Sequence, residues 1–184
     1  MLGTSRDRVV AGFDDWRVVA VTVVAFDDVR VRSLLSVAEE IGEQARGELA
    51  ASGVTINRFV AVTQEWVTIA NIGRLGMGEQ RFPTDETYSR SRFPQVTVLL
   101  ERGEGYLAVQ HAPECPPEVA RMLALFGKSS CVGVPLNGED GQLWGELYAT
   151  RDYGRPAFGQ HELALATALA DEAGPRLAAC PVSP

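Results

Sequence analysis

The stretch from Ser130 to Leu177 constrains the fold more than any other part of the chain. Within it, two apolar runs, Cys131–Leu136 and Leu143–Thr150, flank a polar turn at residues 137–142 that contains Asn, Gly and Asp. Apolar runs of this length on either side of such a turn are typical of a β-hairpin that lies on a core. A further segment, from about Gln160, has the spacing of an amphipathic helix. We therefore expect a hairpin that is covered by the last helix of the chain.

This last helix presents one apolar face to the hairpin. Its apolar residues recur near the 3.6-residue period, and many are small enough to let helix and sheet approach closely. Leu165 and Leu169 are expected to point toward the edge of this face or beyond it. Pro175 has no amide hydrogen and disfavours helical geometry at Gly174, so the packed part of the helix should end or kink there. The residues of the face are Leu163, Ala166, Leu169, Ala170, Ala173 and Leu177.

Short motifs in the hairpin and upstream of it carry a resemblance to a known family. The hairpin region contains Val-Pro-Leu at 134–136, Trp-Gly-Glu-Leu at 144–147, Arg151 and Pro-x-Phe at 156–158. Upstream lie Ile-Ala-Asn-Ile-Gly at 69–73, the run Gly76-x-Gly78-Glu79-x-Arg81-Phe82-Pro83-x-Asp85-Glu86-x-Tyr88, and Phe93-Pro94. The first set resembles the C-terminal half of a GAF domain, the small-ligand sensor module of bacterial signalling proteins. The second is similar to a GAF subgroup common in high-GC bacteria, and the resemblance covers residues 30–179.

The resemblance implies an α+β fold with a central antiparallel sheet. Helices at the start and end of the chain would cover one face of the sheet, and a lid region from the middle of the chain would cover the other. We therefore expect three parts: a helical N-terminal arm at residues 1–29, a GAF-like domain at residues 30–179 and a flexible tail at residues 180–184.

The segment Trp16–Phe26 is compatible with two structures. Its β-branched valines favour a strand, whereas five residues of the region, some preceding the segment, fall on one helical face. These five are Val9, Phe13, Trp16, Ala20 and Val23. GAF domains commonly begin with a helix, so the resemblance favours the helix, but the pattern alone leaves both open.

Local patterns predict the remaining elements. Ser33–Leu49 is expected to form an amphipathic helix, because apolar residues recur there at spacings of three and four. Strands are expected at Thr55–Val62 and Trp66–Ile72, with a turn at Gln64-Glu65 between them. The glycines at 73, 76 and 78 are interpreted as a flexible connection, because neither Walker spacing nor a following helix would make them a phosphate loop. Shorter elements follow: a helix at Phe93–Leu100, a strand at Tyr106–Gln110 and a helix at Pro117–Phe126.

Charge and cysteine content exclude several classes of partner. The net charge of −7 and the pI near 4.9 argue against nucleic acid and anionic membranes, since both attract basic surfaces. The three cysteines, Cys115, Cys131 and Cys180, are odd in number and lack C-x-x-C spacing, which argues against a disulfide framework and a structural zinc site. No signal segment and no apolar span of membrane length is visible. These features favour a cytoplasmic protein.

The resemblance also implies where a ligand would bind. It would lie between the lid, at Phe82 to Phe126, and the strands that contain Phe59, Cys131 and Trp144. Aromatic rings with a few polar anchors suit such a site. Arginines of the lid, at 81, 90, 92, 102 and 121, could bind an anion or pair with surface carboxylates. The candidate ligand-binding residues are Phe82, Tyr88, Arg92, Phe93, Arg121, Cys131 and Trp144.

The sequence gives little support to catalysis or to a metal site. It contains no G-x-S-x-G or H-E-x-x-H motif and only two histidines, of which His161 is expected to be solvated. The resemblance raises two alternatives. His111 could ligate haem, as a histidine of the middle region does in some haem-binding GAF sensors. Cys115 or Cys131 could serve a thiol enzyme of the free methionine sulfoxide reductase type. No Cys-His pair matches the bilin-binding members.

We therefore expect a non-catalytic sensory or regulatory domain whose cofactor is unassigned. It would bind a small molecule or a protein partner and signal through its terminal helices. GAF domains often dimerise through these helices, and both ends of this chain carry apolar residues, so we also expect a homodimer. The residues concerned are Val9, Phe13, Trp16 and Val23 at one end and Leu163, Leu165, Leu169 and Leu177 at the other.

Overall fold

The computed structural model describes residues 28–180, which form six strands, four α-helices and one 3-10 helix. All strand pairs are antiparallel, and the strand order is β3-β2-β1-β6-β5-β4. The α+β class with a central antiparallel sheet is therefore confirmed. The elements are α1 (Asp28–Glu48), β1 (Gly53–Val60), β2 (Glu65–Gly73), β3 (Thr87–Ser89), η2 (Arg90–Arg92), α2 (Pro94–Glu101), β4 (Tyr106–Val109), α3 (Pro117–Leu125), β5 (Lys128–Asn137), β6 (Leu143–Asp152) and α4 (Gln160–Ala178).

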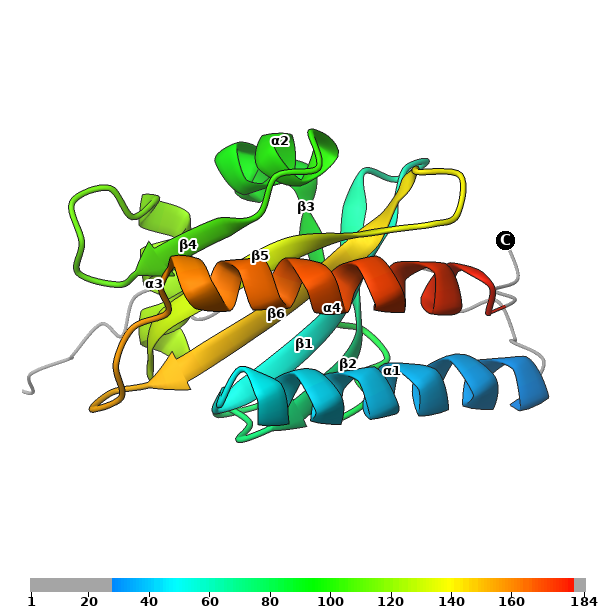
Figure 1. Cartoon of the computed structure of the whole chain (residues 1–184), viewed down its shortest axis with the longest axis horizontal. Coiled ribbons are helices and arrows are strands. Elements are labelled where there is room, and N and C mark those ends of the chain that lie inside the picture. The colour runs from blue at the N-terminus through cyan, green and yellow to red at the C-terminus, as the bar shows by residue number, and fades with distance from the viewer. Residues whose placement is uncertain (1–27, 181–184) are drawn as a thin grey trace, which may run out of the picture.

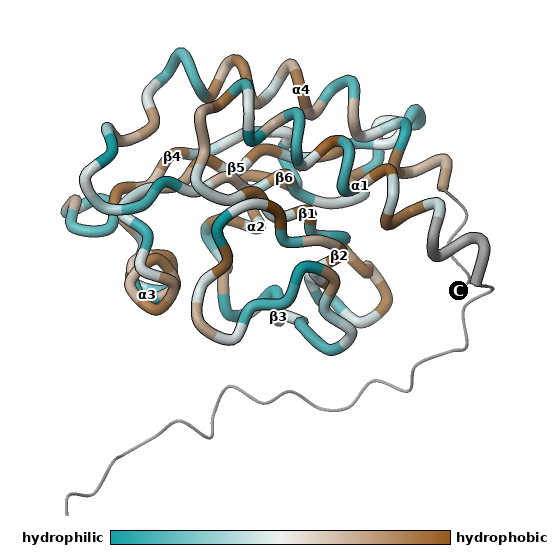
Figure 2. Tube along the Cα trace, turned by 90° about the horizontal axis from the view of Figure 1, so that it is seen from below, coloured by the Kyte–Doolittle hydropathy of each residue, from teal (hydrophilic) through white to brown (hydrophobic). Residues whose placement is uncertain are grey.

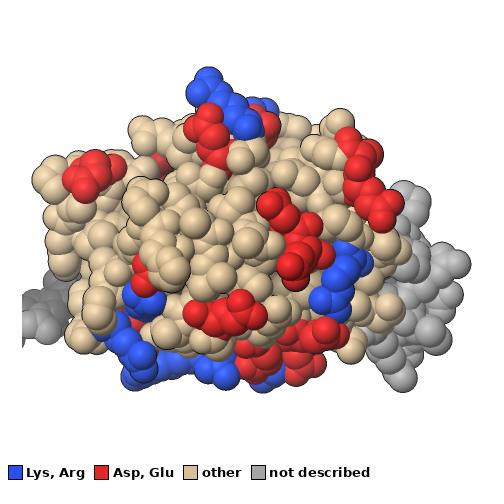
Figure 3. All heavy atoms as spheres, viewed as in Figure 1, with Lys and Arg blue, Asp and Glu red and all other residues tan. Residues whose placement is uncertain are grey.

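Helices cover both faces of the sheet. The helices α1 and α4 run in opposite directions across one face (Figure 1). In Figure 2 these two helices lie on one side of the strands and α3 lies on the other. The predicted hairpin is formed by β5 and β6, and α4 covers it. The outer surface of α1 and α4 carries Asp and Glu side chains at several places, with uncharged surface between them (Figure 3).

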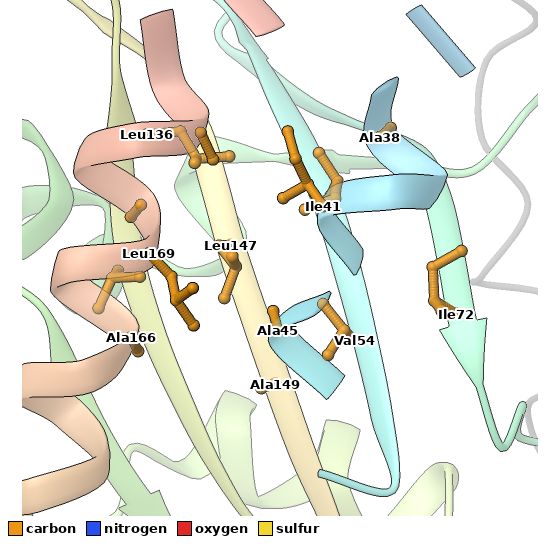
Figure 4. Close-up of a cluster of buried hydrophobic side chains, with 14 of the residues drawn as sticks. Ala38, Ile41, Ala45, Val54, Ile72, Leu136, Leu147, Ala149, Ala166 and Leu169 are labelled. Atoms are coloured by element: carbon orange, nitrogen blue, oxygen red, sulfur yellow. The ribbon is translucent and has the colours of Figure 1, made fainter. Parts of the chain in front are cut away.

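The space between α1, α4 and the sheet is filled by an apolar core. Figure 4 shows Ile41 and Ala45 of α1 and Leu169 of α4 pointing toward Val54 and Leu147 of the strands. Leu147 is 0% exposed, and its neighbours in this cluster are almost all aliphatic. Burial of this apolar surface is the main source of stability for such a layer.

Two expectations about α4 are corrected by this packing. Leu169 is buried in the core and does not lie at the edge of the apolar face, whereas Leu165 is only partly buried against the core, as expected for a residue at that edge. The helix continues through Pro175 to Ala178, and Leu177 is 0% exposed, so the packed part does not end at Gly174. Gly174 lies directly against β5: a Cβ there would be 2.2 Å from the Asn137 carbonyl oxygen. This close approach lets the last turn bury its apolar side chains despite the missing amide of Pro175.

Several boundaries differ from those expected. The first helix begins at Asp28, five residues before Ser33, and Glu65 belongs to β2 instead of the turn. The three-residue strand β3 has no apolar pattern and was not predicted. Cys180 is buried, so a flexible tail cannot begin before residue 181.

The predictions for residues 1–27 lie outside the described residues, including the strand or helix at 16–26. The homodimer stays a prediction that rests mainly on apolar residues there, because the four leucines of α4 pack against the core of their own chain. No helix within residues 28–180 has both the length and the apolar character to cross a membrane.

Candidate functional site

A cavity of about 70 Å³ lies on the other face of the sheet, beneath α2 and α3. This volume is enough to hold several water molecules or part of a small organic molecule. The cavity lies between the lid region and the strands, where the family resemblance placed it. Its wall is formed by apolar side chains of the lid and its floor by polar side chains of β1, β2 and β6.

The apolar wall belongs to a second buried cluster. Phe93, Val96, Val119 and Leu123 come from the lid, and Trp66 comes from β2. The indole of Trp66 donates a hydrogen bond of 3.3 Å to the Thr97 hydroxyl. This bond satisfies the polar atom of Trp66, so its ring adds to an apolar surface that does not bind water well.

Glu146 is the central polar residue of the floor. It is only 6% exposed, and each carboxylate oxygen accepts one hydrogen bond. The Tyr106 hydroxyl donates to one oxygen at 2.8 Å, and the Asn57 amide donates to the other at 3.1 Å. Burial raises the pKa of Glu146, although these two hydrogen bonds act in the opposite direction.

A second carboxylate, Glu86, lies at the other end of the same network. It accepts hydrogen bonds from the Tyr88 hydroxyl at 2.7 Å, the Thr68 hydroxyl at 3.0 Å and the Asn71 amide at 3.1 Å. Thr68 also lies 3.1 Å from the Asn57 amide oxygen. Its single hydroxyl hydrogen can go to only one acceptor at a time. Thr68 and Asn57 therefore connect the two carboxylates through one chain of polar groups.

These two carboxylates have no positive partner among the side chains that the structure describes, residues 33–180. All the ion pairs found there involve other acidic residues. A third lining carboxylate, Glu79, accepts a hydrogen bond from the amide of Gly76, and burial raises its pKa. The cavity floor thus gathers negative charge that is held by neutral donors.

Tyr148 adds an unsatisfied group to this floor. It lines the cavity, is 8% exposed, and its hydroxyl has no hydrogen-bond partner among the described residues. The neighbouring Cys131 thiol is at most a weak partner. Burial raises the pKa of Tyr148 well above its ordinary value and that of Cys131 to about 12. Both side chains are therefore neutral near pH 7.

Two basic residues lie at the edge of the cavity, and both are engaged by Asp152. Lys128 donates to Asp152 at 3.0 Å and to the Arg74 carbonyl at 2.8 Å. The Arg74 guanidinium donates to the other oxygen of Asp152, also at 3.0 Å. Partial burial would raise the pKa of Asp152, but Lys128 and Arg74 outweigh it and lower that pKa. Asp152 therefore neutralises one of the two positive charges at this edge, and the Arg74 side chain is 77% exposed, so water screens its charge.

The structure brings together only some of the candidate residues. Tyr88 and Phe93 line the cavity. Cys131 is 0% exposed in the apolar cluster beside the cavity, outside its lining. The Arg92 guanidinium lies over the Phe93 ring, 6.0 Å from its centroid, and is also outside the lining. Arg121 is exposed on α3, so it does not anchor a ligand in this cavity.

The placements expected for Phe82 and Trp144 are wrong, since both pack against the core under α1 and α4. Trp144 is the extra residue of a β-bulge, because Leu136 pairs with Gly145 and Asn137 pairs with Leu143. Side chains alternate between the two faces of a strand, and the extra residue of a bulge shifts this alternation by one position. Trp144 therefore points to the face opposite to the one expected from regular alternation. Phe82 follows Arg81, whose guanidinium pairs with Glu39 of α1 at 2.5 Å. That pairing is consistent with Phe82 packing on the helical face.

The remaining arginine, histidine and cysteine candidates lie elsewhere. Arg81 and Arg90 form surface ion pairs, the latter with Glu101 at 2.7 Å, and none of the five lid arginines lines the cavity. His111 is exposed in the turn after β4, and its ring lies 6.4 Å from that of Tyr153. Cys115 is half-buried outside the lining. Among the described side chains, from residue 33 to residue 180, no group of three or more His, Cys, Asp or Glu is arranged to hold a metal ion.

Sequence reasoning missed the polar floor of the cavity. In the sequence, Glu86 and Glu146 stand out only as members of the family motifs at 76–88 and 144–147. The signal that could have identified them is a polar side chain inside an apolar strand: Glu146 precedes Leu147, Asn57 follows Ile56, and Asn71 stands between Ala70 and Ile72. Buried polar groups are costly unless they are paired, so such positions indicate a site or a network.

Comparisons with known proteins agree with this architecture. The GAF domain model matches residues 24–177. A similar solved structure is the blue-light absorbing form of the Thermosynechococcus elongatus PixJ GAF-domain, with a TM-score of 0.65 and 17% identity over 83% of this chain and 89% of that chain. No curated protein matches the chain.

Two further structures are similar. The chromophore-binding domain of Stigmatella aurantiaca bacteriophytochrome has a TM-score of 0.64 and 17% identity over 82% of this chain and 57% of that chain. The GAF domain/HD domain protein from Geobacter sulfurreducens has a TM-score of 0.61 and 13% identity over 79% of this chain and 93% of that chain. Identities this low establish the fold and nothing finer.

Proposed function

The chain belongs to the GAF domain family, and from this premise we propose that it is a non-catalytic sensory domain that binds a small molecule in the cavity and reports binding through α1 and α4. The similar structures include a blue-light absorbing domain and a chromophore-binding domain, which supports a sensory role. The observation that carries the proposal is the cavity itself, whose floor holds a buried carboxylate and an unpartnered hydroxyl. Such groups lower the stability of a fold, and proteins tolerate them chiefly where they serve a function.

The two alternative functions gain no support from the cavity. A thiol enzyme needs an accessible cysteine with a lowered pKa. Cys131 is fully buried with a raised pKa, and Cys115 also has its pKa raised, first by burial and then by nearby glutamates. A haem sensor would need a histidine in the site, whereas His111 is exposed outside it.

Strands β1 and β6 offer a direct route from the cavity to the terminal helices. Along β6, Glu146 and Tyr148 line the cavity while Leu147 and Ala149 pack under α1 and α4. Because successive side chains of a strand point to opposite faces, a displacement of β6 moves both sets together. A ligand that shifts this strand would therefore act on the packing of the helices.

A pair of matched variants tests the function. Val119→Phe places a larger side chain in the cavity, whereas Val98→Phe makes the same change on the exposed side of α2, where Val98 is 39% exposed. Purified wild-type protein is analysed by mass spectrometry for bound small molecules and by thermal shift against a metabolite library. We expect compounds that stabilise the wild type and Val98→Phe but not Val119→Phe. If Val119→Phe responds like the wild type, binding does not involve the cavity and the proposal fails.

A further inference from the structure

We propose that the molecule recognised in this cavity is an organic cation, with a protonated amine, amidine or guanidine head that binds the Glu146 carboxylate, while Glu86, at the other end of the same polar network, adds to the negative charge of the site. Its body would be a flat or compact apolar group that packs under α2 and α3. This inference rests on the proposed small-molecule function and adds to it the chemical class of the ligand.

The charge of the cavity floor is the first argument. Glu86 and Glu146 accept hydrogen bonds only from neutral groups and have no ion pair within the described residues. The basic side chains at the cavity edge, Lys128 and Arg74, both pair with Asp152. Inside a poorly solvated cavity, uncompensated negative charge attracts a cation strongly and repels a phosphate or carboxylate.

The unpartnered hydroxyl of Tyr148 is a second, independent observation. It is buried among the lining residues with no oxygen or nitrogen partner in the described chain and only the weakly accepting Cys131 sulfur beside it, although a buried hydroxyl is normally satisfied. Its oxygen can accept a hydrogen bond from an N–H group. Glu146 lies two residues away on the same face of β6. A head with several N–H donors could therefore bind the carboxylate and the hydroxyl together.

The aromatic wall completes the match. The rings of Trp66, Tyr88 and Phe93 all line the cavity, on the side opposite α1 and α4. Aromatic faces attract organic cations, and they also pack well against a planar body. A fully hydrated inorganic cation would gain nothing from this apolar wall, so the geometry favours an organic cation with an apolar part.

Three isosteric probes separate the charge of the ligand from its shape. Benzamidine carries a cationic head, benzamide a neutral head and benzoate an anionic head on the same ring. We expect benzamidine to bind with a dissociation constant on the order of 1 mM or tighter, as small fragments do. Benzamide should bind at least about tenfold more weakly, and benzoate should not bind measurably. Titrations followed by NMR or calorimetry measure all three.

Variants locate the contact. Glu146→Gln should weaken benzamidine binding by about tenfold or more, and Glu86→Gln should weaken it by a smaller factor, because each removes a negative charge from the lining of the cavity. Tyr148→Phe should weaken it by roughly threefold, since it removes a neutral hydrogen bond. Glu139→Gln removes the same charge from the exposed hairpin turn and should leave binding within about twofold. Because Glu86 is less buried than Glu146, its variant remains informative if Glu146→Gln folds poorly.

Each outcome decides between the two proposals. If benzoate binds as well as benzamidine, or if both carboxylate variants keep full affinity, the cationic class is overturned. If no probe binds and the library compounds that stabilise the wild type but not Val119→Phe are neutral or anionic, the cationic class is overturned while the sensory function stands; if those compounds are organic cations, both proposals stand. If no compound of any class binds, the proposed function fails, and the ligand class fails with it.

Discussion

The two faces of the sheet are built from the same strands and yet follow opposite rules. Under α1 and α4, the buried side chains are almost entirely aliphatic, and neighbouring alanines let the helices approach closely. Under α2 and α3, the buried set includes Glu146, Asn57, Thr68 and Asn71, beside a cavity and a hydroxyl without a partner. The first face is a closely packed apolar core, whereas the second combines apolar packing with a group of buried polar side chains around the cavity.

This difference indicates how stability and binding are divided in the domain. Close packing of apolar groups contributes most of the stability of a domain. Buried polar groups and cavities reduce it. We infer that the packed face holds the fold while the polar face is free to hold a site. Neighbouring residues of one strand, which point to opposite faces, should therefore differ sharply in how much their substitution changes the free energy of unfolding.

The largest effect is expected at Leu147, on the packed face of β6. Leu147→Ala removes a fully buried side chain between α4 and the sheet, and such truncations cost about 2–5 kcal/mol of unfolding free energy. Urea or thermal denaturation measures the loss. A value below about 1 kcal/mol would mean that this face can collapse around a gap, which would contradict the close packing described above.

The control for Leu147 is the next residue on the strand. Tyr148→Phe removes only the unpartnered hydroxyl on the polar face, so we expect a change of about 0 to 1 kcal/mol in the stabilising direction. If Tyr148→Phe lowered the free energy of unfolding as much as Leu147→Ala does, the polar face would contribute to stability as much as the packed face, and the proposed division between stability and binding would be wrong.

Arg151 is the polar exception on the packed face. It is 7% exposed, donates to the Leu49 carbonyl at 2.7 Å and to Pro156 at 3.1 Å, and lies 4.1 Å from the centroid of the Phe158 ring. These contacts join the end of α1 to the segment before α4. Arg151→Met keeps the aliphatic part but leaves the carbonyls unsatisfied, so we expect a loss of about 2–3 kcal/mol, measured by denaturation. Arg155→Met, at a nearby exposed arginine, is the control and should change stability by less than about 0.5 kcal/mol.

The sequence was sufficient for the packed face and insufficient for the polar one. Apolar periodicity identified the hairpin, α4 and most of α1, because a regular pattern is what a regular core requires. It failed at Trp144, since a bulge reverses the faces and leaves no mark in the pattern. It failed at Glu86 as well, because that residue lies in a loop before β3 and reaches Thr68 and Asn71 only through the tertiary fold. Long-range polar contacts of this kind have no local signature.

The buried carboxylate of Glu146 should make the effect of its substitution on stability depend on pH. Burial raises the pKa of Glu146 above its ordinary value of 4.5, so its folded-state pKa exceeds its unfolded-state pKa. The stability that the neutral carboxyl group of Glu146 contributes is fully present below the pKa that the group has in the unfolded chain. This stability is lost as the pH rises through the pKa that the group has in the folded protein. We therefore expect Glu146→Gln to be more stable than the wild type at pH 8, by on the order of 1 kcal/mol, and to lose this advantage near pH 4.

Other ionisable groups near Glu146 do not obscure this test. Tyr106, Tyr148 and Cys131 stay neutral across the range, because burial raises the pKa of each. Glu79 also has a raised pKa, but it is present in both proteins, so the difference between the two stability curves reports Glu146. A difference that does not change between pH 4 and pH 8 would refute the buried-charge interpretation.

The smallest effect is expected at the ion pair that joins the two terminal helices. Arg176 of α4 donates to Glu40 of α1 at 2.9 Å, and the two side chains are 44% and 65% exposed. Exposed pairs of this kind are worth about 0.2–1 kcal/mol, because water and salt screen them. A double-mutant cycle with Arg176→Ala and Glu40→Ala should give a coupling energy in this range at low salt, falling toward zero at about 1 M salt. A coupling above about 2 kcal/mol that resists salt would contradict the view that apolar packing, and not this ion pair, holds α1 beside α4.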